Sequence, residues 1–169
     1  MYTVAPERAA IPLAPGAVMD PAAWTSCRIS RFADYDAAIG RSPDHIVVPN
    51  VPGYTPERDA VILDWIRGHT GPTTTLLGIC DGTMIVADTG LATGHFATSN
   101  PADFDYVETH APSATWLPDL RYVDDGSIVT SSAVASGIDA TLLRSRSIRR
   151  TRHGVGCRKP ARIHAYWRP

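Results

Sequence analysis

Residues 76–82 read LLGICDG, and they join a predicted strand over residues 73–79 to a predicted helix that starts at Asp81. Glycines lie two positions before and two positions after Cys80, as in the G-x-S-x-G turn that exposes a nucleophile between strand and helix. Side chains at those two positions would collide in so sharp a turn. A cysteine in a buried strand is more often a small apolar residue, but that interpretation leaves both glycines unexplained. The spacing therefore predicts a nucleophile elbow at Cys80.

Two opposing effects would act on the Cys80 thiol in such an elbow. The start of a helix places unpaired N–H groups near the sulfur, and these stabilise the thiolate. The carboxylate of Asp81 would raise the pKa of the thiol if it points inward, and would only suit the first turn of a helix if it points outward. If the protein is an enzyme, we expect a thiolate at neutral pH.

Strand and helix patterns alternate along the chain, the order expected when helices cover a mostly parallel sheet. Short strands are predicted at residues 2–4, 45–49, 73–79, 96–99 and 128–131. The β-branched run at residues 45–49 indicates a strand that is buried on both faces. The dipeptide Asp125-Gly126 predicts a two-residue hairpin turn. The fold class is therefore α/β.

Three helices are indicated by their capping residues and apolar spacing. The first opens at Thr55, has Pro56 at its first helical position and ends at Gly68. A second, short helix covers residues 81–89. A third opens with a capping box at residues 136–139 and extends through residue 143, where its apolar periodicity stops.

The net charge of −1 over 169 residues conceals two unlike parts. Residues 1–143 hold all 17 acidic residues and 7 arginines, whereas residues 144–169 hold 8 arginines, one lysine and no acid. We expect an α/β domain over residues 1–143 and a basic, poorly patterned tail over residues 144–169. The tail is interpreted as a solvated extension, the product of a shifted reading frame, or a nucleic-acid-binding arm. Because phosphate binding needs clustered basic residues, no nucleic-acid partner is expected for the acidic part.

Composition also bears on location and cofactors. No run of about 18 apolar residues could cross a bilayer, and no secretory signal opens the chain, so a cytoplasmic location is expected. Cys27, Cys80 and Cys157 match neither a disulfide framework nor a zinc ligand set. A cluster of Cys157 with His153 and His164 would lack a fourth ligand. No metal and no other cofactor is expected.

Other polar residues have simpler explanations. His95 lies in a predicted turn and His110 precedes an Ala-Pro pair, so both are expected to be solvent-exposed surface residues. Asp124 and Asp125 form a carboxylate pair, but the tip of a hairpin explains them without a catalytic role.

Longer motifs around these elements resemble one known family. They are HIVVPNVPGYTPE (residues 45–57), GICDGTMIVADTGLATGHFATSN (residues 78–100) and RYVDDGSIVTSSAVASGIDATL (residues 121–142). Together they resemble the DJ-1/PfpI family of the class I glutamine-amidotransferase-like superfamily, of the isonitrile hydratase and AraC-regulator N-terminal domain type. The resemblance covers about residues 2–143. It implies a flavodoxin-like, three-layer α/β/α sandwich with a mostly parallel sheet, and often a homodimer.

The resemblance also implies roles for four residues. Cys80 takes the position of the nucleophile, and the backbone N–H groups of Gly53 and Asp81 take the oxyanion site. Asn100 stands where many relatives have a histidine, and an asparagine cannot accept a proton at neutral pH. Family members usually begin with a strand that carries an acid next to the cysteine. This chain starts at the following strand, so we expect the first strand of an N-terminally truncated domain to be missing.

Three hypotheses for function follow. In the first, the domain is a cysteine-dependent hydrolase or a hydratase (lyase), or a degenerate form of one, in which Cys80 attacks a small electrophilic molecule. In the second, it is a non-catalytic ligand-sensing domain related to AraC-type transcriptional regulators. In the third, it is an α/β-hydrolase of the dienelactone hydrolase kind, for which the 89 residues after Cys80 leave little room. The partner in each case is a small molecule.

Overall fold

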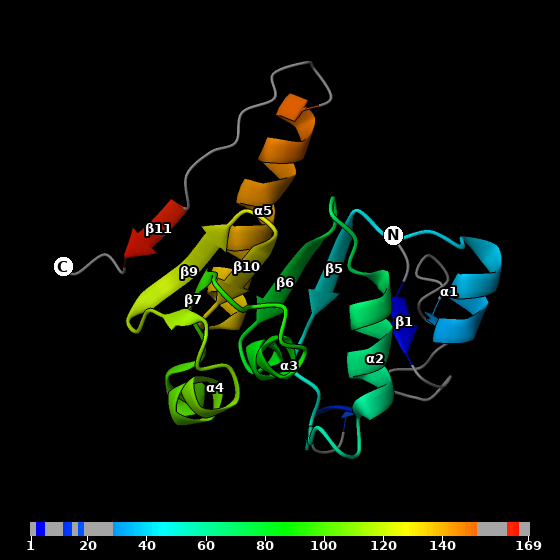
Figure 1. Ribbon diagram of the computed structural model, residues 1–169, viewed down its shortest axis with the longest axis horizontal. Coiled ribbons are helices and arrows are strands. Elements are labelled where there is room, and N and C mark those ends of the chain that lie inside the picture. Colours follow the sequence, from blue (N-terminus) through cyan, green and yellow to red (C-terminus); the bar gives the residue numbers. More distant parts are fainter. Residues whose placement is uncertain (1–2, 6–11, 15–16, 19–28, 152–161, 166–169) are drawn as a thin grey trace. The chain divides into compact units, whose positions relative to one another are not determined.

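The computed structural model describes residues 3–5, 12–14, 17–18, 29–151 and 162–165 (Figure 1). The chain divides into two compact units, Met1–Arg41 and Ser42–Pro169. Of the helices that the structure describes, none is both long enough and apolar enough to cross a membrane.

The first unit contains short strands and one helix. Its elements are β1 (Thr3–Ala5), β2 (Pro12–Ala14), β3 (Ala17–Val18), β4 (Ile29–Arg31) and α1 (Phe32–Ala38). β1 pairs in parallel with β4, and β2 pairs antiparallel with β3. Asp34 in the first turn of α1 accepts a hydrogen bond from the backbone N–H of Arg31, which fixes the start of the helix. β1 corresponds to the strand predicted at residues 2–4, of which Tyr2 lies outside the described residues.

The second unit is built on a five-stranded sheet with the strand order β11, β9, β10, β6, β5. The strands are β5 (His45–Val48), β6 (Thr75–Ile79), β9 (Leu120–Asp125), β10 (Ile128–Ser131) and β11 (Arg162–Ala165). β5, β6 and β10 are parallel, whereas β9 runs antiparallel to both β10 and β11 (Figure 1). A smaller parallel pair consists of β7 (Phe96–Ala97) and β8 (Thr115–Trp116). The centre of the sheet is therefore parallel, as predicted.

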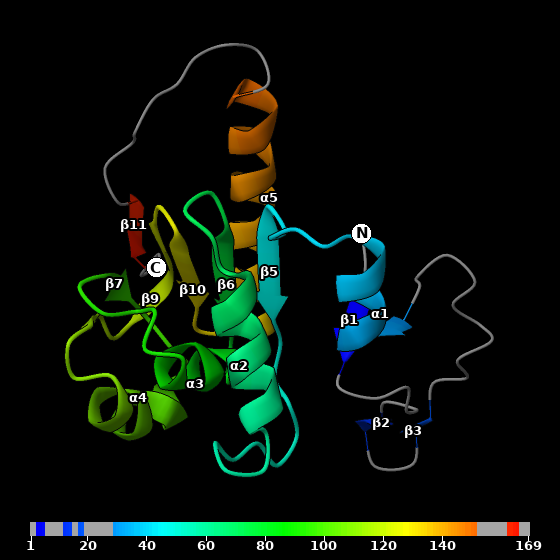
Figure 2. The same ribbon diagram turned by 45° about the vertical axis from the view of Figure 1, so that its right-hand side comes forward.

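Helices cover both faces of this sheet, which makes the second unit a three-layer structure. They are α2 (Ala60–His69), α3 (Gly82–Asp88), α4 (Phe104–His110) and α5 (Val134–Thr151), with a 3₁₀ turn, η2 (Pro101–Asp103). Leu76 of β6 packs in one core cluster with residues of α2 and α3, and the next residue, Leu77, packs in another with Ala140 of α5. Figure 2 shows α5 on one side of the sheet and α2 and α3 on the other. Neighbouring residues of β6 thus pack against helices on opposite faces of the sheet, as the predicted α/β/α sandwich requires.

The burial predicted for the strand at residues 45–49 is wrong at Val47, on one of the two faces. Ile46 and Val48 are buried, but the side chain of Val47 is 52% exposed. Val47 pairs with Leu77 and so faces the same side of the sheet as α5. α5 packs against β9, β10 and β6. Val47 lies on the edge strand β5, and among the described residues its side chain is left largely exposed.

The first predicted helix begins later and ends later than its capping residues suggested. Thr55 caps a turn instead, with its hydroxyl accepting the backbone N–H of Arg58 at 3.3 Å, and α2 starts after that turn. Gly68 lies inside α2 and does not end it. The helix ends at His69 and is capped by Thr70, whose N–H and hydroxyl both donate to the carbonyl of Ile66, at 3.0 and 2.8 Å.

The hairpin and the third predicted helix are each displaced along the sequence. Asp125 pairs with Ile128, so the turn is Gly126 and Ser127 rather than Asp125 and Gly126. Only the glycine of that turn has a positive φ, of 80°. α5 begins at Val134, before the predicted capping box, because the hydroxyl of Ser136 accepts the N–H of Ala133 from within the first turn.

Several elements have no counterpart in the sequence prediction. They are β2, β3, β4, α1, η2, α4, β8 and β11. α5 also continues past residue 143 to Thr151, so the change in composition at residue 144 falls inside a helix. The predicted division of the chain at that residue stays a prediction.

Candidate functional site

Cys80 forms the turn between β6, which ends at Ile79, and α3, which begins at Gly82. Its φ is 54°, in the left-handed region that residues with a Cβ rarely adopt. Its N–H donates to the carbonyl of Ser131 at 2.9 Å, and this bond ties the turn to β10. Such a conformation costs about 1–3 kcal/mol and is concentrated at functional sites.

The two glycines that flank Cys80 are required by close contacts, as the sequence predicted. A Cβ on Gly78 would lie 3.0 Å from the hydroxyl oxygen of Thr83. A Cβ on Gly82 would lie 2.1 Å from the carbonyl oxygen of Val48 and 2.8 Å from that of Pro49. The end of β5 therefore touches the start of α3 directly, with no room for a side chain between them.

The Cys80 thiol is half-buried and lies in a small network of polar groups. Its Sγ donates to Oδ1 of Asp81 at 3.1 Å. The amide of Asn100 donates to the same Asp81 oxygen at 2.8 Å and to the sulfur at 3.3 Å. Asp81 thus points inward, toward the sulfur. Asn100 is a hydrogen-bond donor that holds both partners.

This network sets the protonation state of the thiol. Burial raises the pKa of Cys80, and the hydrogen bond to the Asp81 carboxylate raises it further, while a backbone hydrogen bond from Asp81 and the amide of Asn100 lower it. The net direction is upward. The hydrogen bond with Cys80 in turn lowers the pKa of Asp81. The resting pair is therefore a thiol and a carboxylate, and the thiolate expected from the helix start is wrong because the inward Asp81 and burial outweigh it.

A second acid, Asp103, is the last residue of η2. Its Oδ2 is buried and has no hydrogen-bond partner among the described residues. Burial and the negative charge of Asp81 raise the pKa of Asp103 to about 6. Asp103 could not be found from the sequence, because it lies 22 positions after Asp81 and no motif connects the two.

Gly53 lies in the turn that follows β5 and has a φ of 66°, which suits glycine. The turn is closed by a hydrogen bond from the N–H of Tyr54 to the carbonyl of Val51 at 3.0 Å. The hydroxyl of Tyr54 donates to Asp88 of α3 at 2.6 Å, so the loop with Gly53 is fastened to the helix that follows Cys80.

Asp88 is a buried anchor, with a side chain that is only 5% exposed. Besides Tyr54, it binds the hydroxyl of Tyr106 at 2.7 Å and Nδ1 of His110 at 2.6 Å, both on α4. The rings of Tyr106 and His110 stack with their centroids 3.8 Å apart. Burial and the hydrogen bond to Asp88 raise the pKa of both tyrosines. One carboxylate therefore connects α3, α4 and the Gly53 loop.

We expect Asp88→Ala to destabilise the protein by about 2–4 kcal/mol, because it leaves two tyrosine hydroxyls and a histidine without their acceptor. Urea unfolding followed by circular dichroism measures this. Asp64→Ala is the matched control, since Asp64 is 76% exposed and pairs with Arg67 of the same helix. That change should stay within about 0.5 kcal/mol. Equal effects of the two substitutions would contradict the anchoring role of Asp88.

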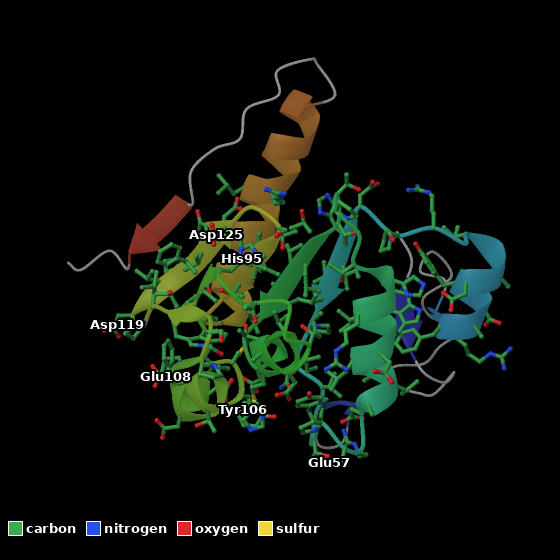
Figure 3. All side chains as sticks on the ribbon, in the orientation of Figure 1. Glu57, His95, Tyr106, Glu108, Asp119 and Asp125 are labelled. Atoms are coloured by element: carbon green, nitrogen blue, oxygen red, sulfur yellow. The ribbon has the colours of Figure 1, made fainter. Side chains whose placement is uncertain are left out.

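Both histidines that were expected at the surface contact a carboxylate. His110 is exposed, as predicted, and its Nδ1 contacts Asp88. His95 is 30% exposed, and its Nδ1 lies 3.1 Å from Oδ2 of Asp125 (Figure 3). Asp125 also accepts the backbone N–H of Phe96 at 2.8 Å, so it joins the hairpin to β7. Both contacts join distant segments of the chain.

The remaining cysteines and the proposed zinc set fall largely outside what the structure describes. Cys27, His153 and Cys157 are not among the described residues. Within the described ranges, no group of three or more His, Cys, Asp or Glu side chains could hold a metal ion.

The geometry defines a class of protein: a three-layer α/β domain with a strained cysteine at the turn between a central parallel strand and the following helix. A model of the DJ-1/PfpI family matches residues 30–143, and the chain belongs to that family. This confirms the resemblance seen in the sequence. The match begins at residue 30, whereas the resemblance was expected to begin at about residue 2.

Individual relatives agree with this assignment. The chain is 30% identical over 106 residues to an isonitrile hydratase from Pseudomonas putida, a match that covers 62% of this chain and 45% of that protein. The chain thus corresponds to less than half of that curated relative.

Solved structures support the fold. A THiJ/PfpI family protein from Pseudomonas syringae superposes with a TM-score of 0.65 at 18% identity, over 92% of this chain and 64% of that one. An AraC family transcriptional regulator from Pseudomonas putida superposes with a TM-score of 0.52 at 14% identity, over 73% and 75% of the two chains. The flavodoxin-like fold class is confirmed.

Proposed function

We propose that this domain acts through Cys80 on a small electrophilic molecule, and that the molecule is an isonitrile. The observation that carries the proposal is the thiol–carboxylate pair, in which a cysteine in a strained conformation donates to Asp81 at 3.1 Å. A strained cysteine hydrogen-bonded to a base is the arrangement that nucleophilic catalysis needs. Family membership and the isonitrile hydratase relative support the choice of substrate.

The chemistry begins with proton transfer within the pair. Asp81 accepts the thiol proton while Sγ of Cys80 bonds to the isonitrile carbon, and the proton then passes to that carbon, which gives a thioimidate, R–N=CH–S–Cys80. Water adds to the same carbon, with Asp81 accepting a proton from it and the nitrogen gaining one. The carbon–sulfur bond then breaks and the sulfur recovers its proton. The products are an N-substituted formamide and the free thiol, so one isonitrile and one water are consumed.

Other groups of the site assist these steps. The amide of Asn100 holds the sulfur and Asp81 together. We assign to the backbone N–H groups of Gly53 and Asp81 the role of stabilising the negative charge that develops during addition. The contact of Gly82 with the carbonyls of Val48 and Pro49 supports this assignment, because it joins the start of the Gly53 loop to the Cys80 turn.

A ligand-sensing domain, like those of AraC-type regulators, is the second candidate. Two observations favour it: the thiol is protonated at rest, and Asn100 supplies a donor in place of a base. In that case an isonitrile or a similar small molecule would bind without being consumed.

The two candidates are separated by one assay with the purified chain and n-butyl isonitrile. The proposal expects N-butylformamide to accumulate over many turnovers, as measured by proton NMR. Saturable binding by calorimetry with no formamide would favour the sensing domain. If neither binding nor formamide is detected, isonitriles are ruled out as the substrate class.

A further inference from the structure

Ser127, His95 and Asp125 meet at the hairpin between β9 and β10, and the proposed function uses none of them. Nδ1 of His95 lies 3.1 Å from Oδ2 of Asp125 (Figure 3). Nε2 of the same ring lies 3.5 Å from the hydroxyl oxygen of Ser127. A carboxylate on one ring nitrogen and a hydroxyl on the other is the arrangement of a serine hydrolase triad, which is recognised by geometry rather than by sequence position.

The contact with Asp125 decides which nitrogen of the neutral His95 ring carries the proton. A carboxylate has only acceptors, so Nδ1 is the nitrogen that donates to it. Nε2 then keeps its lone pair and can accept the proton of the Ser127 hydroxyl. The separation of 3.5 Å between Nε2 and this hydroxyl is long for a formed hydrogen bond. Catalytic hydrogen bonds are often long in the absence of substrate and shorten when it binds.

Hydrogen bonds to separate strands hold each member of this triad. The carbonyl of His95 accepts the backbone N–H of Thr115, in β8, at 2.9 Å. Oδ2 of Asp125 also accepts a backbone N–H of β7 at 2.8 Å. The carbonyl of Ser127 accepts the N–H of Leu76, in β6, at 2.8 Å. The nucleophile, the base and the acid are therefore positioned independently of one another, as a preorganised site requires.

A small molecule can reach the hydroxyl of Ser127. This residue is exposed at the tip of the hairpin, and the side chains of His95 and Asp125 are 30% and 22% exposed. Within the described part of the chain, no hydrogen bond engages the backbone N–H of Ser127. That N–H is available to the carbonyl oxygen of a substrate, a role that the nucleophile's own N–H has in serine hydrolases. Since one such donor stabilises little charge, the fitting substrates are small esters with a good leaving group.

We propose that Ser127, His95 and Asp125 form a second catalytic site, which hydrolyses small activated carboxylic esters. This site does not depend on the function proposed for Cys80. Ser127 directly precedes β10, whereas the N–H of Cys80 binds Ser131 at the other end of that strand. Four residues of strand span about 13 Å, so the two sites lie at opposite edges of the sheet.

The reaction has two steps. First, the hydroxyl oxygen of Ser127 bonds to the carbonyl carbon of the ester while Nε2 of His95 takes the hydroxyl proton. The bond from that carbon to the alcohol oxygen breaks, and Nε2 gives its proton to the departing alcohol. Water then bonds to the acyl carbon and loses a proton to Nε2, the bond to Ser127 breaks, and its oxygen recovers the proton. The Asp125 carboxylate stabilises the imidazolium in both steps, and one ester and one water give an acid and an alcohol.

A fluorophosphonate probe tests the triad without requiring turnover, because an activated serine displaces its fluoride and stays bonded to phosphorus. Peptide mass spectrometry of the labelled wild-type chain should place the probe on Ser127. Labelling should become at least about 100-fold slower in His95→Gln, which lacks the proton acceptor. Ser113→Ala is the matched control, since Ser113 is also exposed, and it should leave the rate at Ser127 unchanged. A wild-type chain that is not labelled at Ser127 overturns the inference, and so does equal labelling in His95→Gln.

Hydrolysis of p-nitrophenyl acetate measures turnover at the same site. Ser127→Ala should lower the rate at least about 10-fold, whereas Ser113→Ala should keep it. Labelling of Ser127 without this loss of hydrolysis also overturns the inference. Ser127→Ala should not change formamide production. If formamide is absent but hydrolysis depends on Ser127, the isonitrile function fails and the ester site stands. If formamide forms but Ser127 takes no label, the ester site fails and the isonitrile function stands.

Discussion

Gly82→Ala is expected to destabilise this domain strongly. The added Cβ would lie 2.1 Å from the carbonyl oxygen of Val48 and 2.8 Å from that of Pro49. Both atoms belong to the backbone at the end of β5, so no side-chain rotation can relieve the contact. Overpacking usually costs about 1–3 kcal/mol. Because backbone must move here, we expect a loss of at least about 3 kcal/mol from a total that is about 5–15 kcal/mol for a domain.

Gly68→Ala provides the matched control for this change. Gly68 lies inside α2, and a Cβ there would meet nothing within 4 Å. Alanine should therefore stabilise the helix by about 0.5–1 kcal/mol. Urea unfolding of both variants gives the comparison. A Gly82→Ala protein that unfolds at the wild-type urea concentration would contradict the close contact between β5 and α3.

Cys80→Ser is expected to reduce formamide production more than about 1,000-fold, because a serine hydroxyl is a far weaker nucleophile than a thiol beside the same carboxylate. The stability should change by less than about 1 kcal/mol, since the hydroxyl of serine can donate to Asp81 as the thiol does. Formamide NMR and thermal unfolding measure the two effects. Cys27→Ser is the control and should keep full activity. Retained activity in Cys80→Ser would exclude a covalent role for the sulfur.

The turn at Cys80 could be predicted because its geometry is local. Gly78 and Gly82 are needed within four residues of each other, and a Cβ at either position meets its neighbours at 3.0 Å or less. The side-chain direction of Asp81 could not be predicted. It depends on Asn100, which donates to both Asp81 and Cys80 from a segment that packing brings to the site.

Long-range contacts account for what the sequence did not indicate. Asp88 binds side chains from two segments, one near residue 54 and one near residue 106, and neither spacing forms a motif. The charge of Asp81 likewise raises the pKa of Asp103, which lies 22 positions away in the sequence. Val47 is exposed although its residue type favours burial, because the burial of a strand depends on which helix covers it. Local sequence patterns thus predicted the three layers and the turn at Cys80. Which charged side chains come together depends on tertiary packing, and this could not be predicted.

The central claim is that the sulfur of Cys80 is the reacting atom, and partial alkylation tests it most directly. The chain is treated with increasing amounts of iodoacetamide, and each sample is divided between peptide mass spectrometry and the n-butyl isonitrile assay. The account predicts that residual formamide production falls in direct proportion to the fraction of Cys80 alkylated, independently of Cys27 and Cys157. Full activity in a sample whose Cys80 is completely alkylated would contradict it.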